Sequence, residues 1–491
     1  MTGTSMPQKN SLFSPPTDII FITSYTETAR DLILVANELR SRGFSVLFCL
    51  LNKNPALVRL IDDQEFDLIH YSDPQALLKV ASADDELVAS VPKSYEPSNA
   101  GSMLQILRRI AKWLGVEELG IELTWQRRAM RAAKRLFEIR RPRVVVMDAD
   151  SVPPAIQISR AAQHLSVPSV VVQSGILATP HWLAVRNLTL QDTDSSCTPI
   201  LERLGARVVQ RFWPAFVQRV EGKPVLNGFG PFPVLVGAVL GVLPISNWLQ
   251  FGGGGSAYAV AGEYSHTILT EYGIDPTKIH LCGHPRMDRA AGFGQSRLSG
   301  SLGRGRTDEP DGQIIDVLFA TSPWARPGVS DAEEKRMVVG AVAREIAKVS
   351  ERIRVTIKLH PREPACEYDG ALRAVPRCRV KQTEDIVDLI SQCDIFVTQM
   401  STAALYSIAA GRPVVTFSFD GRAMFDLLHD MGVSIHCRNL EDIRSAVERL
   451  SSGSSASEAV KEQRAVLERK MLIDGQATRK VADLVKEYLR T

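Results

Sequence analysis

Two short polar motifs in the second half of the chain have residue types that suit the binding of an anionic group. They are His360, Pro361 and Arg362 at the end of the apolar run IRVTIKLH, and Thr398, Ser401 and Thr402 at and after the end of the run DIFVT. An imidazole can stabilise negative charge on a leaving phosphate, and free N–H groups and hydroxyls at a helix start form a phosphate site. We therefore predict that His360, Ser401 and Thr402 converge on one phosphate-bearing ligand. A turn histidine held by the backbone and a plain helix cap are the structural alternatives.

Other polar residues at the ends of strand-like runs are candidates for the same site. The run VLFA leads into Thr321 and Ser322, and Lys358 lies within the run that carries His360. Ligands of open parallel sheets bind at the carboxyl ends of the strands, so we count these residues with the phosphate site. The turn at Gly283 either brings backbone close to the ligand or acts as a hinge between two parts of the chain.

Transfer to a hydroxyl group needs a base, and three carboxylates in the first half of the chain are candidates for it. Asp148 and Asp150 follow the apolar run VVVM, and Glu27 follows the first strand-like run. Capping of the helix that begins near Pro153 is the structural alternative for Asp150. Asp148 and Asp150 also form an Asp-x-Asp string, which binds a divalent metal in some transferases. Because the string lies in the first half of the chain, we predict no metal.

Short β-rich runs alternate with helix-length segments along most of the chain, which predicts parallel sheets covered by helices on both faces. Residues 291–312 interrupt this alternation and are rich in Gly and Ser, as flexible connections are. The predicted fold class is α/β, with two Rossmann-like parallel-sheet domains facing each other across a cleft. The predicted parts are a disordered N-terminus at 1–16, a first domain for the acceptor at 17–290, a flexible linker at 291–315, and a second domain for the donor, with terminal helices, at 316–491.

The composition is that of an ordinary globular protein and excludes several classes of function. Of the 491 residues, 45% are hydrophobic and 23% are charged. A formal net charge of +3 is too small to suggest nucleic acid as a partner, and no nucleic-acid-binding motif appears. The cysteines include no Cys-x-x-Cys pair, and the first 16 residues lack the apolar core of a signal peptide. We therefore predict a cytoplasmic protein, either free or on the cytosolic face of a membrane.

One segment does not fit a plain soluble enzyme. From Pro224 to Gly262 the chain carries no charged residue, and this stretch contains the run PFPVLVGAVLGVLPISNWLQF. A membrane-spanning helix needs about 20 apolar residues, and prolines interrupt this run. We predict an apolar insertion at about 225–255 that is either buried or in contact with one leaflet. Basic and aromatic residues in 103–140 and 182–219 favour peripheral contact with the inner face of the cell membrane.

Several motifs resemble those of a large bacterial group of GT-B glycosyltransferases. The motifs are GHPRMD, KLHPRE, the strand followed by Ser-Thr and AAGRPVV, and the late DGQAT. The group includes capsule-type Kdo and sialic acid transferases, CDP-glycerol glycerophosphotransferases and, more distantly, UDP-N-acetylglucosamine 2-epimerases. The resemblance covers roughly residues 140–180 and 256–485. It implies the GT-B fold, and it implies that His360, Ser401 and Thr402 hold the phosphates of a donor nucleotide.

The chain departs from this group at two positions. Ser174 stands in VVVQSGIL where the group commonly has histidine, which weakens any transfer of acceptor-side roles. Tyr406 stands in the helix where many GT-B enzymes carry a carboxylate for the donor ribose. These departures leave open a non-catalytic protein that binds nucleotide sugars on a degenerate transferase fold.

The leading interpretation is a metal-independent glycosyltransferase of surface polysaccharide or capsule biosynthesis. It moves a sugar from a nucleotide-sugar donor to a glycan or lipid-linked acceptor and needs no cofactor beyond this co-substrate. Transfer of a polyol phosphate from a CDP-polyol would use the same phosphate site and stays open. A sugar epimerase is disfavoured, because it needs no membrane-facing surface.

Overall fold

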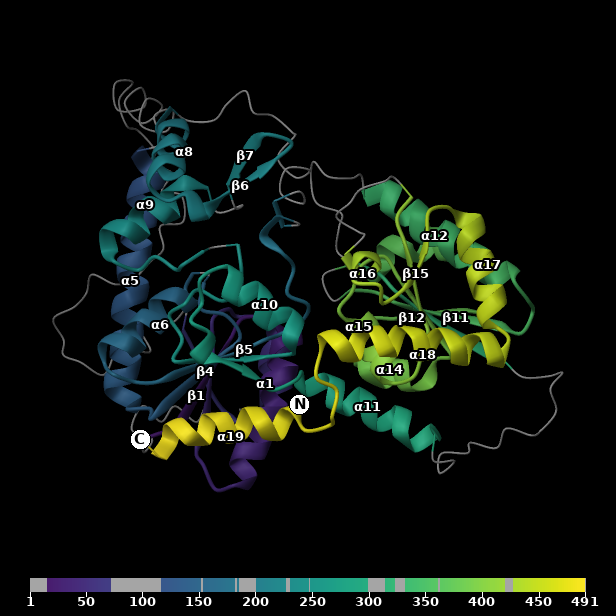
Figure 1. Ribbon diagram of the computed structural model, residues 1–491, viewed down its shortest axis with the longest axis horizontal. Coiled ribbons are helices and arrows are strands. Elements are labelled where there is room, and N and C mark those ends of the chain that lie inside the picture. Colours follow the sequence, from purple (N-terminus) through teal and green to yellow (C-terminus); the bar gives the residue numbers. More distant parts are fainter. Residues whose placement is uncertain are drawn as a thin grey trace, which may run out of the picture.

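The computed structural model describes residues 16–71, 116–151, 153–181, 183–184, 200–226, 230–246, 248–298, 314–322, 332–360, 363–419 and 427–490. Within these ranges the chain forms two parallel β-sheets, each covered by helices, and the two halves lie side by side (Figure 1). We call the part built on the first sheet the first half and the part built on the second sheet the second half. This arrangement confirms the predicted α/β fold class with two parallel-sheet domains.

The first sheet has seven strands in the order β3-β2-β1-β4-β5-β8-β9. Each neighbouring pair is parallel, with Ile19 opposite Val46 and Val144 on its two sides. The strands are β1 (Ile19–Thr23), β2 (Val46–Leu50), β3 (Asp67–His70), β4 (Val144–Met147), β5 (Ser169–Val172), β8 (Ala257–Val260) and β9 (Ile279–Leu281). The chain reverses its direction of sheet growth between β1 and β4, so the first switch point of this doubly wound sheet lies there.

The second sheet has six strands in the order β12-β11-β10-β13-β14-β15, and it is also parallel throughout. The strands are β10 (Ile315–Ala320), β11 (Ile353–Lys358), β12 (Cys378–Lys381), β13 (Ile395–Thr398), β14 (Val414–Phe417) and β15 (Ile435–Cys437). Its order repeats the Rossmann pattern of the first sheet, and its switch point lies between β10 and β13. β12, a short and largely polar edge strand, was not among the strands predicted from apolar runs.

The central strands are buried on both faces, which explains their near-continuous apolar sequences. β1, β4, β5, β8, β13 and β14 are buried at every position, as strands with helices on both sides must be. In the first half the helices are α1 (Thr26–Ser41), α2 (Pro55–Asp62), α5 (Val116–Arg140), α6 (Ala155–His164), α8 (Ile200–Phe212), α9 (Pro231–Leu240) and α10 (Glu263–Glu271). In the second half they are α12 (Ala332–Lys348), α13 (Asp369–Leu372), α14 (Ile386–Gln392), α15 (Ala403–Ala409), α16 (Leu427–Asp430), α17 (Leu440–Leu450) and α18 (Gly453–Lys470).

Helix α11 (Pro285–Leu298) continues into the segment predicted as a flexible linker at 291–315. Gly294 is one reason, because a Cβ at this position would lie 3.1 Å from the carbonyl oxygen of Ala409 in α15. At Gly294 the missing side chain thus allows α11 and α15 to approach each other closely. Residues 299–313 of the predicted linker, and most of the predicted disordered N-terminus, lie outside the described residues.

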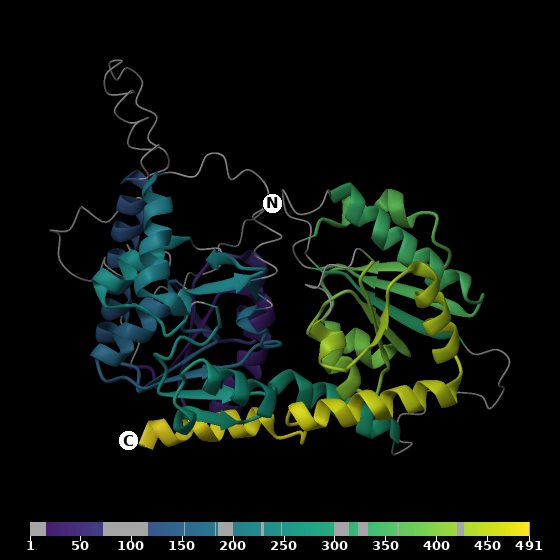
Figure 2. The same cartoon turned by 45° about the horizontal axis from the view of Figure 1, so that its top comes forward.

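The C-terminal helices join the two halves. α18 packs in the second half, and α19 (Ala477–Arg490) lies along the first half, so together they form a band beneath both (Figure 2). Val481 and Val485 of α19 are fully buried in the core of the first half. The backbone crosses close to Gly262, where a Cβ would lie 2.4 Å from the Cα of Met471. At Gly283 (φ +86°) a Cβ would lie 2.9 Å from that of Ala477, so this glycine contacts the crossing segment.

The predicted apolar insertion at about 225–255 is mostly interior. It includes the end of a small antiparallel hairpin, β6 (Val217–Val220) and β7 (Lys223–Leu226), followed by α9 and a loop. Phe232 and Val234 of α9 and Trp248 of the loop are buried, whereas Val239 is 78% exposed. Among the helices described, none combines the length and apolar character that crossing a bilayer requires.

Candidate functional site

The loops after β10, β11 and β13 are hydrogen-bonded to one another at the carboxyl edge of the second sheet. The hydroxyl of Thr321, after β10, accepts a hydrogen bond from the backbone N–H of His360, after β11, at 3.0 Å. Ser322 donates through Oγ to the carbonyl oxygen of Met400, directly before Ser401, at 2.6 Å. The structure therefore brings the predicted residues of three separate motifs to one edge, beside the second switch point. Pro361 and Arg362 lie outside the described residues.

Glu363, which is not among the residues predicted from the sequence, fixes the turn that carries His360. Its buried carboxylate accepts hydrogen bonds from the N–H of His360 at 2.9 Å and from the hydroxyl of Tyr368 at 3.1 Å. It also accepts from Thr321 and forms an ion pair with Lys335. A buried carboxylate with this many partners holds the local backbone in one conformation.

The remaining predicted residues of the second half differ in how their polar groups are used. Thr398 is fully buried and donates to the carbonyl oxygen of Ala320 at 2.9 Å. Lys358 donates to two backbone carbonyls, at 2.9 and 2.7 Å, and burial lowers the pKa of its ammonium group. Ser401 and Thr402 are only partly buried. Thr402 also accepts, at 3.4 Å, a hydrogen bond from the N–H of Ile176 in the first half, so the loop after β5 reaches the predicted phosphate site.

At the first switch point Asp148 occupies the carboxyl end of β4. Its buried carboxylate accepts a hydrogen bond from Thr23, at the end of β1, at 3.1 Å. Thr23 and Thr28 have their hydroxyl oxygens 2.9 Å apart. Burial raises the pKa of Asp148, and hydrogen bonds from Thr28 and Thr23 oppose that rise. A carboxylate with a raised pKa at this position has the properties of a general base.

Asp150 lies two residues further on and has different surroundings. One carboxylate oxygen accepts from the N–H of Gly252, and the other accepts from the N–H groups of Gly254 and Gly255 and the hydroxyl of Tyr258, each at 2.9 Å. Three of the four donors share one oxygen, so the carboxylate is held firmly against this loop. Burial raises the pKa of both aspartates, and Asp148 also has four hydrogen-bonding partners. What distinguishes Asp150 is that three of its donors belong to one loop, so its carboxylate anchors the glycine loop.

Glu27 belongs to a charged network at the boundary between the halves. Arg286 of α11, nearly fully buried, forms ion pairs with Glu27 at 2.9 Å and with Asp385 at 3.3 Å. Asp385 caps α14 in the second half and also pairs with Arg30 of α1. Burial would raise the pKa of Asp385, but Arg286 and Arg30 together lower it. The network thus links α1 and α11 to the second half.

A second buried pair lies beside this network. The Nδ1 atom of His284 lies 3.6 Å from Oδ1 of Asp31 in α1, and both side chains are almost fully buried. The Nε2 atom of His284 accepts from the N–H of Gly175 at 3.1 Å and lies 3.5 Å from the hydroxyl of Tyr406. Burial raises the pKa of Asp31 to about 8 and lowers that of His284 to about 3. In Asp31 the positive charge of Arg286 opposes the rise, while Glu27 and Asp148 increase it.

The sequence contained partial signals for these additional residues. His284 and Arg286 belong to GHPRMD, but only Gly283 of that motif was selected. Tyr406 is one of the two departures from the related group, and the guanidinium carbon of Arg286 lies 5.1 Å from the centre of its ring. Asp31 was detectable only as a lone acidic residue on the buried face of α1.

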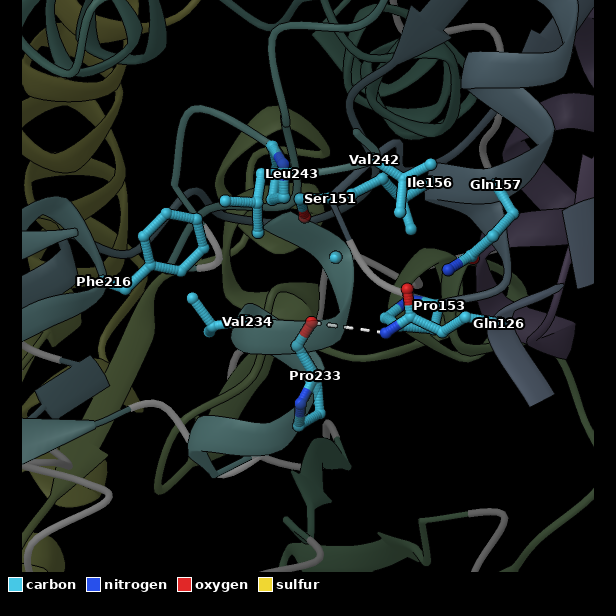
Figure 3. Close-up of a pocket in the computed structure, with 12 residues that line it drawn as sticks. Gln126, Ser151, Pro153, Ile156, Gln157, Phe216, Pro233, Val234, Val242 and Leu243 are labelled. Carbon is cyan, nitrogen blue, oxygen red and sulfur yellow. Dashed lines mark hydrogen bonds between the residues drawn. The ribbon is translucent and has the colours of Figure 1, made fainter. Parts of the chain in front are cut away.

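A separate pocket lies in the first half between α5, α6 and α9 (Figure 3). Its lining is mainly apolar, and none of the predicted phosphate-binding residues contributes to it. Both amide atoms of Gln157 and the Oε1 atom of Gln126 lack a hydrogen-bond partner among the described residues. Gln126 does donate to the carbonyl oxygen of Pro233 in α9, at 3.3 Å. Ser151 and Pro153, which follow Asp150, line the same pocket, so α9 lies close to the predicted acceptor side.

In the ranges that the structure describes, no cluster of three or more His, Cys, Asp or Glu side chains is arranged to hold a metal ion. Metal independence and the lack of a cofactor stay predictions.

No protein-family model matches the sequence, and neither does the sequence of any curated protein. Solved structures do resemble the fold. UDP-GlcNAc 2-epimerase from Neisseria meningitidis, solved with UDP-GlcNAc bound, gives a TM-score of 0.53 at 12% identity, over 96% of this chain and 99% of that one. Another UDP-N-acetylglucosamine 2-epimerase gives 0.52 at 11% identity, over 97% and 98% of the two chains. The glycotransferase of kitacinnamycin gives 0.50 at 13% identity, over 96% of this chain and 99% of that one.

At these identities the likeness concerns the fold alone, and it extends over nearly the full length of each protein. It agrees with the two doubly wound sheets and with the motifs noted in the sequence. The chain therefore has the GT-B fold.

Proposed function

We propose that this protein is a metal-independent glycosyltransferase that uses a nucleotide-sugar donor. The observation that carries the proposal is the hydrogen-bonded edge of the second sheet, where Thr321, Ser322, His360 and Met400 join three loops beside Ser401 and Thr402. Such an edge, at a switch point, is where doubly wound sheets bind nucleotides. The Neisseria meningitidis structure of the same fold contains UDP-GlcNAc, which supports this class of donor.

In the proposed reaction an acceptor hydroxyl attacks the anomeric carbon of the donor sugar. Asp148 takes the proton of this hydroxyl, and the bond between the sugar and the phosphate of the nucleotide breaks. His360, Ser401 and Thr402 stabilise the negative charge of the leaving nucleotide. Glu27 is a less direct candidate for the base, because its carboxylate is paired with Arg286. Asp150 is less favoured still, because its carboxylate holds the glycine loop between α9 and β8.

The acceptor is proposed to be a glycan or a lipid-linked saccharide of surface polysaccharide biosynthesis. The reaction would then take place at the cytoplasmic side of the cell membrane, with the protein in peripheral contact. Exposed apolar side chains on α8 and α9 of the first half support this placement. Transfer of a polyol phosphate from a CDP-polyol is the alternative that would use the same residues.

The test is a thermal-stabilisation screen with CMP-, CDP-, UDP- and GDP-sugars and CDP-glycerol, because a ligand that binds the native state raises its melting temperature. We expect one nucleotide-sugar class to stabilise the protein and His360→Ala to weaken that stabilisation. His164→Ala, at an exposed histidine of α6, is the matched control and should behave like the wild type. Stabilisation by CDP-glycerol alone would replace the glycosyl donor with a polyol phosphate. No stabilisation by any of these compounds would reject the proposal.

Turnover provides the second readout. Once a donor is identified, His360→Ala and Asp148→Asn should each lower kcat by roughly 100-fold or more, as expected for loss of charge stabilisation or of a general base. A protein that binds the donor but shows no transfer to any saccharide acceptor, as wild type, would instead be the non-catalytic form of this fold.

A further inference from the structure

Helix α8 presents an outer face on which an apolar stripe and a basic stripe run in parallel. Its inner face, at Gly205 and Val209, is buried, and a Cβ at Gly205 would lie 3.2 to 3.4 Å from atoms of Pro231 and Leu235 of α9. On the outer face the apolar residues are Leu204, Val208 and Phe212, which are 48%, 40% and 68% exposed. The exposed basic residues are Arg203, Arg207 and Arg211. Residues four apart share one side of a helix, so each set forms a continuous stripe.

The two helices that lie with α8 also expose apolar side chains. α5, α8 and α9 lie together in the first half, on the side away from the second half (Figures 1 and 2). Val239 of α9 and Ile121 and Trp125 of α5 are exposed. About half of the large apolar side chains exposed in the described ranges lie on these three helices. Apolar side chains gathered in this way mark a contact surface rather than the usual scatter of single exposed residues.

The charge of the α8 face indicates its partner. Among the described residues no carboxylate pairs with Arg203, Arg207 or Arg211. Glu202, the acidic residue of α8, has different neighbours: its Oε1 atom would lie 3.5 Å from a Cβ at Gly230. Burial raises its pKa, and the charge of Glu118 raises it further. A row of unpaired guanidinium groups beside a row of apolar side chains matches the layered structure of an anionic bilayer, with phosphates outside and acyl chains beneath.

We propose that the outer face of α8 binds the surface of an anionic lipid bilayer. Phe212, Val208 and Leu204 enter the boundary between headgroups and acyl chains, and the three arginines contact lipid phosphates. This surface lies within 182–219, one of the two ranges whose basic and aromatic residues predict membrane contact, whereas most of the uncharged segment at 225–255 is buried, and its helix α9 packs against the inner face of α8. Only the purpose of this membrane binding, to bring the acceptor side close to a lipid-linked substrate, rests on the proposed function.

The experiment measures binding of the full chain to vesicles by co-sedimentation. Vesicles of phosphatidylglycerol and phosphatidylcholine are compared with vesicles of phosphatidylcholine alone, at low and high salt. We expect binding to the anionic vesicles that weakens with salt. Reversal of the basic stripe, Arg203→Glu with Arg207→Glu and Arg211→Glu, should lower the partition coefficient by at least about 100-fold, because each basic residue contributes roughly fivefold. Phe212→Ala should lower it by about tenfold or more.

The matched control reverses three exposed basic residues of α5, at Arg127, Arg131 and Lys134, and should retain most of the binding. Equal loss in this control, equal binding to phosphatidylcholine alone, or unchanged binding after reversal of the α8 stripe would overturn the proposal. So would a concentration-dependent dimer that α8 substitutions dissolve, since a second copy would then cover this face.

Each variant is also tested for stabilisation by nucleotide sugars. We expect the α8 variants to keep the wild-type stabilisation, which shows that the protein is folded and that its donor site is intact. If the wild type binds anionic vesicles but no nucleotide sugar, the proposed function fails while the α8 surface stands. If it binds a donor but no vesicles, the reverse holds.

Discussion

Asp31 and His284 show how burial changes single side chains at the boundary between the halves. In an unfolded chain at neutral pH Asp31 is ionised and about a quarter of His284 is protonated. Burial raises the pKa of Asp31 to about 8 and lowers that of His284 to about 3. At neutral pH the folded protein therefore holds both groups mainly in their neutral forms. The pair fills the space between α1, the loop at Gly175 and Tyr406 without placing a net charge there.

These shifts predict the pH dependence of stability. A raised carboxyl pKa favours folding below pH 4, and this contribution is lost as pH rises to about 8; the lowered pKa of His284 favours folding above pH 6.5. Between pH 6.5 and 8 the ionisation of Asp31 should lower the stability of the fold, and His284, already neutral there, should not offset this loss. Asp31→Asn should therefore gain about 2–4 °C in melting temperature relative to wild type over this interval. The exposed Asp62→Asn serves as the control, and a difference that stays constant with pH would contradict the assignment.

The loop between α9 and β8 depends on one carboxylate. Gly252, Gly254 and Gly255 donate their N–H groups to Asp150, so the loop is tied to the carboxyl end of β4. At Gly252 a Cβ would lie 2.5 Å from the carbonyl oxygen of Asp150, which explains why glycine is needed at this approach. The same strand end presents Asp148, so a structural and a proposed catalytic carboxylate lie two residues apart.

Substitution should separate these two roles. Asp150→Ala leaves several buried N–H groups without an acceptor, and we expect it to lower the free energy of unfolding by about 2–4 kcal/mol. Asp148→Asn keeps a hydrogen-bond acceptor for Thr23, so its effect on stability should be below about 1.5 kcal/mol while turnover is lost. Chemical denaturation followed by assay of the folded protein measures both quantities. A stable but inactive Asp150→Ala variant would exchange the assignments.

The two halves are held together by α11, by the crossing from α18 to α19, and by the network around Asp385. This aspartate receives Arg286 and Arg30, and both its own side chain and that of Arg286 are almost fully buried. Asp388, one turn further along α14, pairs with Arg289, but both side chains are about 45% exposed. Each of these ion pairs joins an arginine of α11 to an aspartate at or near the start of α14, and the two pairs differ in burial.

Asp385→Ala leaves a guanidinium group buried beside Glu27 alone. We expect a loss of about 3–5 kcal/mol in the free energy of unfolding and a calorimetric transition that separates into two, one for each half. Asp388→Ala removes an exposed pair and should cost about 1 kcal/mol or less. Equal effects of the two substitutions would show that burial of this network does not hold the halves together.

The periodicity of the sequence was sufficient for the fold class and for most of the central strands. Apolar runs such as VVVM and IFVT are visible locally because a strand covered on both faces must be apolar along its whole length. The short polar strand β12 and the β6–β7 hairpin were not predicted, since neither has such a run. The motifs after β10, β11 and β13 were also local signals, and their meeting at one edge follows from parallel pairing.

The charged network at the boundary and the burial of most of the uncharged segment at 225–255 could not be predicted from the sequence. In the sequence Asp31 and Asp385 look like ordinary acidic residues of helices. In the folded protein His284 packs against Asp31 and Arg286 pairs with Asp385, although both partners are distant in the sequence. Likewise, an uncharged segment is buried or exposed according to what covers it, and here α8 and α5 cover α9. Local residue patterns fix which elements form, whereas the burial of a side chain depends on distant segments that only folding brings together.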